Sequence, residues 1–199
     1  LLSYPDHCVV DSENVSIKVR DKDTKKVITL ANILKAPKIK TNLLPKEKEL
    51  LDVVLKERQE KRRVLVYASF TGKRDIQGRI KDVLDKGGFK SAILTKSINA
   101  ERRESWIKKQ VEEHDIDVLI CNPELVKTGL DLIDFPTIIF FQSGYKIDTL
   151  RQASRRSWRL GQYKPVRVYF FCYDKTFQSA ALSLIAQKLD CALTVEGDL

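Results

Sequence analysis

Five short apolar runs, separated by segments with helical spacing, are the feature that most constrains the fold of this 199-residue chain. The runs lie at residues 64–68, 92–95, 117–121, 137–141 and 166–171. Strands that are apolar along their whole length are buried on both faces, as in parallel sheets covered by helices. The sequence therefore predicts an α/β fold with a parallel sheet and helices on both of its faces.

The segments between these runs carry apolar stripes with the period of a helix. Pro45 suits the first turn of a helix, and Leu50, Leu51, Val54 and Leu55 follow it at helical spacing. Similar stripes lie at 76–84, 106–111 and 182–189. This alternation of strand and helix predicts one main domain over residues 45–199.

The first 44 residues have a different pattern. Residues 15–20 alternate apolar and polar side chains, 21–24 read as a turn, and 25–30 read as a returning strand. A connector containing lysines and prolines follows at 31–44. We therefore expect residues 1–44 to form a small N-terminal β-hairpin and linker ahead of the main domain.

Composition narrows the classes of function. The net charge of +9 and the pI near 9.3 favour a nucleic acid or another polyanion as partner. No apolar run approaches the length of about 18 residues that a membrane span needs, so no membrane partner is expected. The four cysteines form no C-x-x-C pair, which argues against zinc and fits a reducing, intracellular setting. The absence of methionine indicates a piece of a longer protein.

The segment 152–162 is the most specific motif. On a helix that ends at Gly161, Gln152, Arg156 and Arg159 would share one face. Arginine offers a planar, permanently charged fork of donors that suits a phosphate chain. The alternative interpretation is an ordinary basic surface helix, because charge runs usually face solvent.

The order Gln-x-x-x-Arg-x-x-Arg-x-Gly-Gln resembles motif VI of the superfamily 2 helicases and is most similar to the Swi/Snf-type DNA translocases. The resemblance covers about residues 45–189 and implies the second, C-terminal RecA-like domain of such a motor. In that family the two arginines reach the γ-phosphate of ATP held on the neighbouring domain. It implies that Gln152, Arg156 and Arg159 are catalytic, with Arg159 as the arginine finger.

Two residues after the third apolar run are expected to contact the cofactor. Gly129 permits close approach of the backbone, and Asp131 offers an acceptor to a sugar hydroxyl. The segment resembles motif V, with Gly-Leu-Asp-Leu in place of the usual Gly-Leu-Asn-Leu. The Gly- and Ala-rich centre of that motif is replaced here by residues 122–127, which begin with Asn122.

Five residues are predicted to contact nucleic acid. Residues 64–72 resemble motif IV, and residues 94–103 resemble the family's Leu-Asp-Gly-Ser segment. The resemblance implies backbone contacts by Ser69, Thr71, Lys96, Ser97 and Asn122. Ser69 and Thr71 are placed at a helix N-terminus, where free N–H groups bind phosphate, and plain helix capping is the alternative for both. Arg103 is expected to be structural.

The chain contains neither a P-loop nor a D-E-x-H or D-E-A-D box. ATP and its Mg²⁺ are therefore expected on an N-terminal RecA-like domain of the same protein, and the present chain alone is not expected to hydrolyse ATP. The favoured function is the C-terminal motor domain of an ATP-dependent translocase or helicase that acts on DNA, or on RNA. The alternatives are a passive basic nucleic-acid-binding RecA-like module and a stand-alone nucleotide-binding or flavodoxin-like domain, which leaves the arginine series unexplained.

Overall fold

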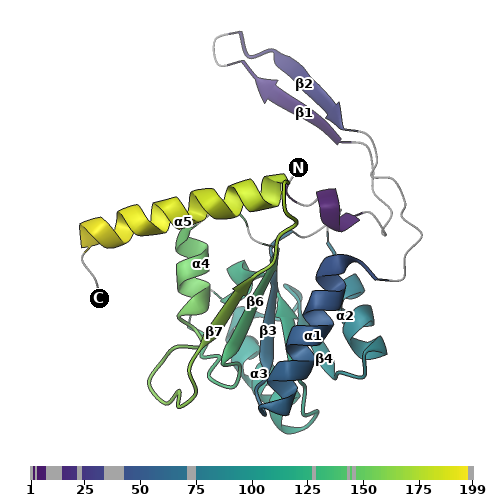
Figure 1. Ribbon diagram of the computed structural model, residues 1–199, viewed down its shortest axis with the longest axis vertical. Helices are drawn as coiled ribbons and strands as arrows, with labels where there is room; N and C mark the ends of the chain where they lie inside the picture. Colours follow the sequence, from purple (N-terminus) through teal and green to yellow (C-terminus); the bar gives the residue numbers. More distant parts are fainter. Residues whose placement is uncertain are drawn as a thin grey trace.

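The computed structural model describes residues 2, 4–7, 15–21, 24–33, 43–70, 75–126, 129–142, 144 and 147–196. Within them, five strands form one parallel sheet in the order β4-β5-β3-β6-β7 (Figure 1). The strands are β3 (Val64–Ala68), β4 (Ser91–Leu94), β5 (Val118–Cys121), β6 (Thr137–Gln142) and β7 (Arg167–Phe170). The predicted parallel sheet is confirmed.

Helices connect the strands and cover both faces of the sheet. They are α1 (Pro45–Gln59), α2 (Gln77–Lys86), α3 (Arg103–Glu112), α4 (Ile147–Ser154) and α5 (Phe177–Glu196). Short 3-10 helices occur as η1 (Tyr4–His7), η3 (Ala100–Arg102) and η4 (Pro123–Val126). Because strand side chains alternate between the two faces, β3 contributes to two separate cores. Val64 and Val66 pack with α1 and α2, whereas Leu65 and Tyr67 pack on the face that α3 and α4 cover.

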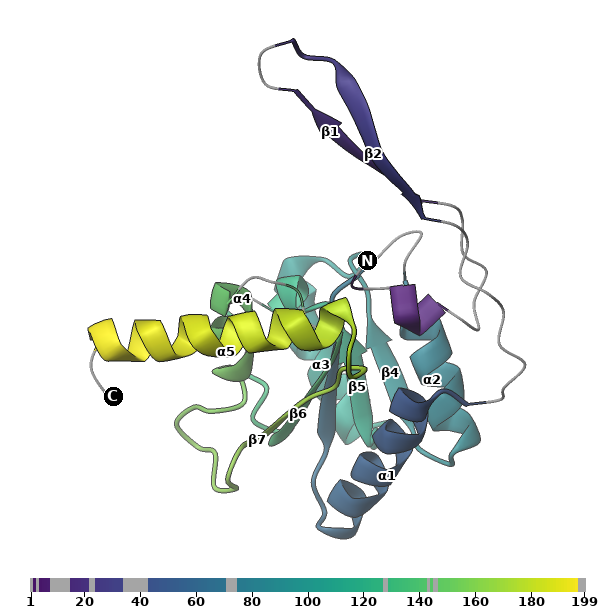
Figure 2. The ribbon, with the colours of Figure 1, turned by 45° about the horizontal axis from the view of Figure 1, so that its top comes forward.

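Helix α5 lies across the end of the sheet where the strands finish, and its second half extends beyond the sheet (Figures 1 and 2). Near its beginning, Gln178 and Ala181 are buried, and Ile185 joins the core beneath α4. Further along, most of the described side chains are exposed. The first half of α5 therefore anchors the helix to the domain.

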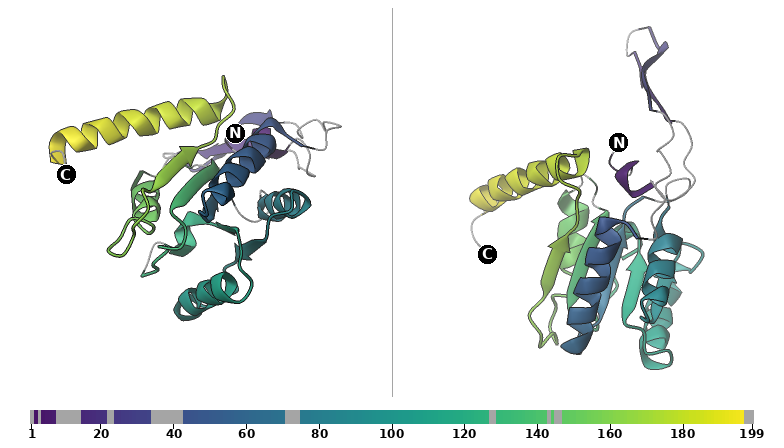
Figure 3. Two further views of the ribbon diagram at one scale, coloured as in Figure 1. Left: turned by 60° about the horizontal axis from the view of Figure 1, so that its bottom comes forward. Right: turned by 45° about the vertical axis from the view of Figure 1, so that its right-hand side comes forward.

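The predicted hairpin is also confirmed. Strands β1 (Val15–Arg20) and β2 (Val27–Ile33) pair antiparallel, with a shift in register between Ile17 and Lys18. Among the described strands, these two pair only with each other, and they project away from the parallel sheet (Figure 3). The second strand extends to Ile33, three residues past its expected end at 30.

A buried ion cluster fixes the opposite end of the sheet, where the strands begin. The Glu57 carboxylate is fully buried and accepts from Arg62 Nε at 2.6 Å, Thr137 Oγ1 at 2.5 Å and Arg167 Nη1 at 2.9 Å. Arg62 also donates to the carbonyl oxygen of Pro136 at 2.9 Å. Burial raises the pKa of Glu57, but the hydrogen bonds from Thr137, Arg167 and Arg62 outweigh it, so the net shift is downward. The cluster ties the end of α1 to the first residues of β6 and β7.

Candidate functional site

The arginine segment does not form the predicted helix. Helix α4 ends at Ser154, so Gln152 lies on the helix whereas Arg156 lies in a turn and Arg159 in a bend. The Ser154 hydroxyl donates back to the Leu150 carbonyl at 2.8 Å, a bond that competes with regular helix. The Leu132 amide donates to the Arg156 carbonyl at 3.0 Å, which removes that carbonyl from any helical ladder. The prediction that these three side chains share one helical face is therefore wrong.

Gly161 has a different role from the expected helix cap. Its φ of +95° lies in the left-handed region, which glycine adopts readily. It closes a turn in which the Gln162 amide donates to the Arg159 carbonyl at 3.0 Å. The Gln162 side-chain Nε2 then donates to the Ile133 carbonyl at 2.8 Å. Gly161 and Gln162 thus attach the loop after α4 to the segment that leads into β6.

Arg159 and Asp131 form an ion pair. Nη1 of Arg159 lies 2.5 Å from Oδ1 of Asp131. The Arg159 side chain is 40% exposed and the Asp131 side chain is 46% exposed. Gly129, two residues before Asp131, has a φ of +74° and open space around the position of a Cβ. The structure therefore brings together the segments that resemble motifs V and VI.

Arg156 lies deeper than Arg159. It is half-buried, and its positive charge acts on Tyr67, a fully buried residue of β3. Burial raises the pKa of Tyr67 well above its ordinary value, and the charge of Arg156 opposes that shift. The Tyr67 hydroxyl donates to the Ala153 carbonyl at 3.3 Å. Arg156 is thus an inner and Arg159 an outer member of the arginine pair.

The loop around the arginines exposes large apolar side chains. Trp158 is 70% exposed, Tyr163 is 96% exposed and Leu160 is completely exposed. This loop lies between α4 and β7, at the lower left of Figure 1, whereas the strands of the sheet finish near α5. This loop therefore lies away from the end of the sheet where the strands finish.

Ser69 and Asn122 lie at the carboxyl ends of the neighbouring strands β3 and β5. The Ser69 hydroxyl donates to the Gln142 carbonyl at 2.7 Å, and Asn122 Nδ2 donates to the Ser69 carbonyl at 3.1 Å. Helix α2 begins only at Gln77, so the placement of Ser69 at a helix N-terminus is wrong. Thr71 lies outside the described residues. Ser69 and Asn122 therefore join the ends of β3, β5 and β6.

Lys96 and Ser97 lie on an exposed turn after β4. The hydroxyls of Ser97 and Thr95 are 2.6 Å apart, and Ser97 borders a hollow of about 470 Å³. The other side chains of this hollow include the cations Arg102 and Lys109. This exposed turn thus combines positive charge with a hydroxyl group. Arg103, expected to be structural, donates to the carbonyl oxygens of Ile98 and Leu125 inside the domain.

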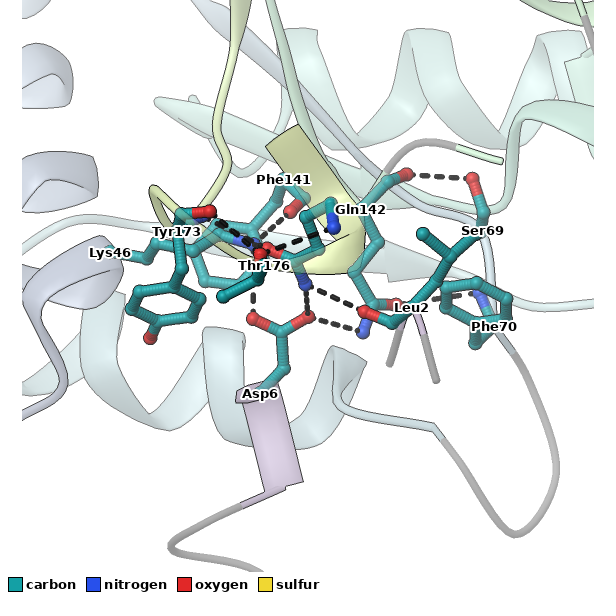
Figure 4. A network of polar contacts seen from close by, with 10 residues as sticks. Leu2, Asp6, Lys46, Ser69, Phe70, Phe141, Gln142, Tyr173 and Thr176 are labelled. Atoms are coloured by element: carbon teal, nitrogen blue, oxygen red, sulfur yellow. Dashed lines mark hydrogen bonds and ion pairs between the residues drawn. The ribbon is translucent and has the colours of Figure 1, made fainter. Parts of the chain in front are cut away.

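A second hollow, of about 460 Å³, lies at the carboxyl ends of β3 and β5. Its lining includes Ser69, Asn122 and Leu2. Next to it is a buried polar network that sequence reasoning missed (Figure 4), made by Asp6, Lys46, Gln142 and Gln178. Burial lowers the pKa of Lys46, and the Asp6 carboxylate opposes that shift. The only feature of the sequence that could have indicated this network is the position of Gln142 directly after an apolar run.

Within the described ranges, no three His, Cys, Asp or Glu side chains gather in a way that could hold a metal ion. In the same part of the chain, no helix combines the length and apolarity needed to cross a membrane.

Comparison with known proteins identifies the family. Residues 45–161 match the helicase conserved C-terminal domain. The ATP-dependent helicase FUN30 of Saccharomyces cerevisiae is 31% identical over 142 residues, which are 71% of this chain and 12% of FUN30. The chromatin-remodeling ATPase INO80 of Arabidopsis thaliana is 28% identical over 141 residues, which are 70% of this chain and 9% of INO80. The chain thus spans about a tenth of the length of these curated relatives.

A solved structure agrees with this assignment at the level of the fold. The crystal structure of the C-terminal part of the Fun30 ATPase domain matches with a TM-score of 0.61 at 21% identity. The match covers 70% of this chain and 44% of that one. The resemblance to superfamily 2 helicases of the Swi/Snf type is confirmed by these matches. The chain belongs to the helicase conserved C-terminal domain family, with a RecA-like fold.

Proposed function

We propose that this chain is the C-terminal motor domain of an ATP-dependent DNA translocase or helicase. ATP and its Mg²⁺ would be held by an N-terminal RecA-like domain of the same protein. Hydrolysis of this ATP would supply the free energy for movement. Arg159 would act as the arginine finger, Arg156 would bind the same phosphate chain from deeper in the domain, and Gln152 would support them from α4. The names of FUN30 and INO80, an ATP-dependent helicase and a chromatin-remodeling ATPase, support this proposal.

The state of Arg159 is the observation that carries the proposal. Its side chain is 40% exposed, and its guanidinium is paired with the carboxylate of Asp131, whose side chain is 46% exposed. An ion pair this accessible to solvent stabilises a protein by only about 0–1 kcal/mol. An arginine finger typically contributes about 10³- to 10⁵-fold in turnover, or roughly 4–7 kcal/mol of barrier. Breaking the ion pair with Asp131 would therefore cost little free energy when the two domains close, compared with the barrier reduction expected of an arginine finger.

The apolar side chains beside Arg159 support closure against another domain. Trp158, Leu160 and Tyr163 are each at least 70% exposed. Three large exposed apolar side chains within six residues of the chain favour an interaction surface at this loop. We assign this surface to the N-terminal RecA-like domain, because docking there would bring Arg156 and Arg159 to a phosphate chain on the other side.

The DNA-contacting residues would lie on a different surface. Lys96 and Ser97 are exposed beyond the end of β4, and the ends of β3 and β5 carry Ser69 and Asn122. Thr71, in the segment after Ser69, belongs to the same predicted set. With ATP and DNA on separate surfaces, movement of the whole domain during closure would shift the DNA backbone.

The deciding experiment is Arg159→Ala in the longest form of the protein that includes the upstream sequence. DNA-stimulated ATP hydrolysis should fall by about 10³- to 10⁵-fold while ATP binding is retained. Arg155→Ala is the matched control, since Arg155 is an exposed arginine in the same turn. Near-normal turnover in Arg159→Ala, or an equal loss in Arg155→Ala, would overturn the assignment.

A further inference from the structure

Asp6 carries a buried carboxylate at the end of the sheet where the strands finish. Asp6 is only 3% exposed and accepts three hydrogen bonds from residues far along the chain (Figure 4). Lys46 Nζ donates to Oδ1 at 3.0 Å, whereas Gln142 Nε2 at 3.1 Å and Gln178 Nε2 at 2.9 Å both donate to Oδ2. A buried charge persists only when it is paired and hydrogen-bonded, and Asp6 meets both conditions. The η1 segment is thereby fixed to α1, β6 and α5.

Gln142 links Asp6 to the Ser69–Phe70 loop through hydrogen bonds. Its Nε2 donates to Asp6, its Oε1 accepts from the Phe70 amide at 3.4 Å, and its carbonyl accepts from the Ser69 hydroxyl at 2.7 Å. An amide side chain has one donating and one accepting end. Because a carboxylate only accepts, Asp6 sets the orientation of the Gln142 amide. The oxygen is then turned toward Phe70, as Figure 4 shows.

The N-terminal segment also forms part of the hollow at this edge. The Leu2 carbonyl accepts from Gln178 Nε2 at 2.7 Å, and Leu2 lines the hollow beside Ser69, Phe70 and Asn122. Leu2 and Asp6 lie outside the segment that matches the helicase domain, which begins at residue 45. A segment outside the family match therefore shapes a surface that the match covers.

We propose that Asp6 is a positioning residue for DNA binding: through Gln142 it holds the Ser69–Phe70 loop in the conformation that contacts the DNA backbone. The inference rests on the proposed function, because it requires that this edge binds DNA. Asp6→Asn tests it with little change in side-chain volume. Asparagine keeps one acceptor oxygen and gains a donor, so it cannot serve both Lys46 and the two glutamine amides.

The first measurement is the affinity of the 199-residue chain for a short fluorescein-labelled DNA duplex at low salt. Asp6→Asn should raise the dissociation constant by about fivefold. Glu57→Gln is the matched control, because Glu57 is another fully buried carboxylate with several donors, at the opposite end of the sheet. Glu57→Gln should lower Tm without changing the affinity. Both variants are measured well below their own Tm.

The second measurement is hydrogen exchange at the Phe70 amide, which a general loss of stability would not single out. Asp6→Asn should accelerate exchange there relative to the core amides of β3, and Glu57→Gln should not. The inference is overturned if Asp6→Asn lowers Tm but shows the same Phe70 exchange and the same DNA affinity as Glu57→Gln. If Lys96→Ala and Asn122→Ala also leave the affinity unchanged, the proposed DNA surface fails. Accelerated Phe70 exchange in Asp6→Asn would then show the coupling without a role in binding.

Discussion

Asp131 and Arg159 meet at 2.5 Å across two segments that resemble separate motifs of the helicase family. Asp131 stands where the similar translocases usually have asparagine, which carries no charge. In this chain the proposed arginine finger therefore has a carboxylate partner before any nucleotide arrives. If Arg159 acts as proposed, Asp131 would compete with the triphosphate for the guanidinium. Asp131 also offers the acceptor that was predicted to bind a sugar hydroxyl.

Replacing Asp131 with asparagine should release Arg159 and raise kcat/KM for ATP in the longest form of the protein. The gain should reach at most about fivefold, since an exposed ion pair contributes only about 0–1 kcal/mol. Steady-state ATPase assays with saturating DNA measure it. Asp134→Asn, an exposed acid in the same loop, is the control and should have no effect. A fall in kcat/KM for Asp131→Asn would instead indicate direct contact between Asp131 and the nucleotide.

Leu160→Ser tests whether the apolar loop docks on another domain. Leu160 is completely exposed, so the free energy of unfolding of the 199-residue chain should change by less than about 0.5 kcal/mol. DNA-stimulated ATPase activity of the longer protein should nevertheless fall, because the closed state loses apolar contact. Leu184→Ser, at a 41% exposed leucine on α5, should leave the activity unchanged. Equal activities in the two variants would argue against docking at Leu160.

The extent to which the sequence predicted this structure follows from where each contact lies along the chain. The strands were predictable because burial on both faces requires apolar residues at every position, as in β3 and β6. The end of α4 was not predictable from the sequence, because the Arg156 carbonyl accepts a hydrogen bond from the amide of Leu132, a residue in another segment. Asp6 gave no signal for the same reason: its partners Lys46 and Gln142 are brought to it only by the fold.

The Glu57 cluster predicts how stability depends on pH. The pKa of Glu57 is lower in the folded state than its ordinary value, so its ionised form favours folding. This contribution is present at neutral pH and is lost as the pH falls through the folded-state pKa. Glu57→Gln should lower the free energy of unfolding by about 3 kcal/mol at pH 7, and the difference from wild type should shrink in acid. Urea titrations across that range measure it, and a pH-independent difference would contradict the ionic role.

Lys96 should contribute to DNA affinity mainly through its charge. Binding by the 199-residue chain should be weak, indifferent to sequence and strongly weakened by salt, because phosphate contacts release counterions. Lys96→Ala should reduce the slope of log K against log salt concentration by about 1, and the loss should be the same for unrelated duplex sequences. Lys56→Ala removes an equal charge from an exposed position on α1, away from the ends of β4 and β5, and should leave the slope nearly unchanged. Equal slopes for both variants would mean that net charge alone attracts DNA. A smaller slope for Lys96→Ala alone would place a phosphate at the turn beside Ser97.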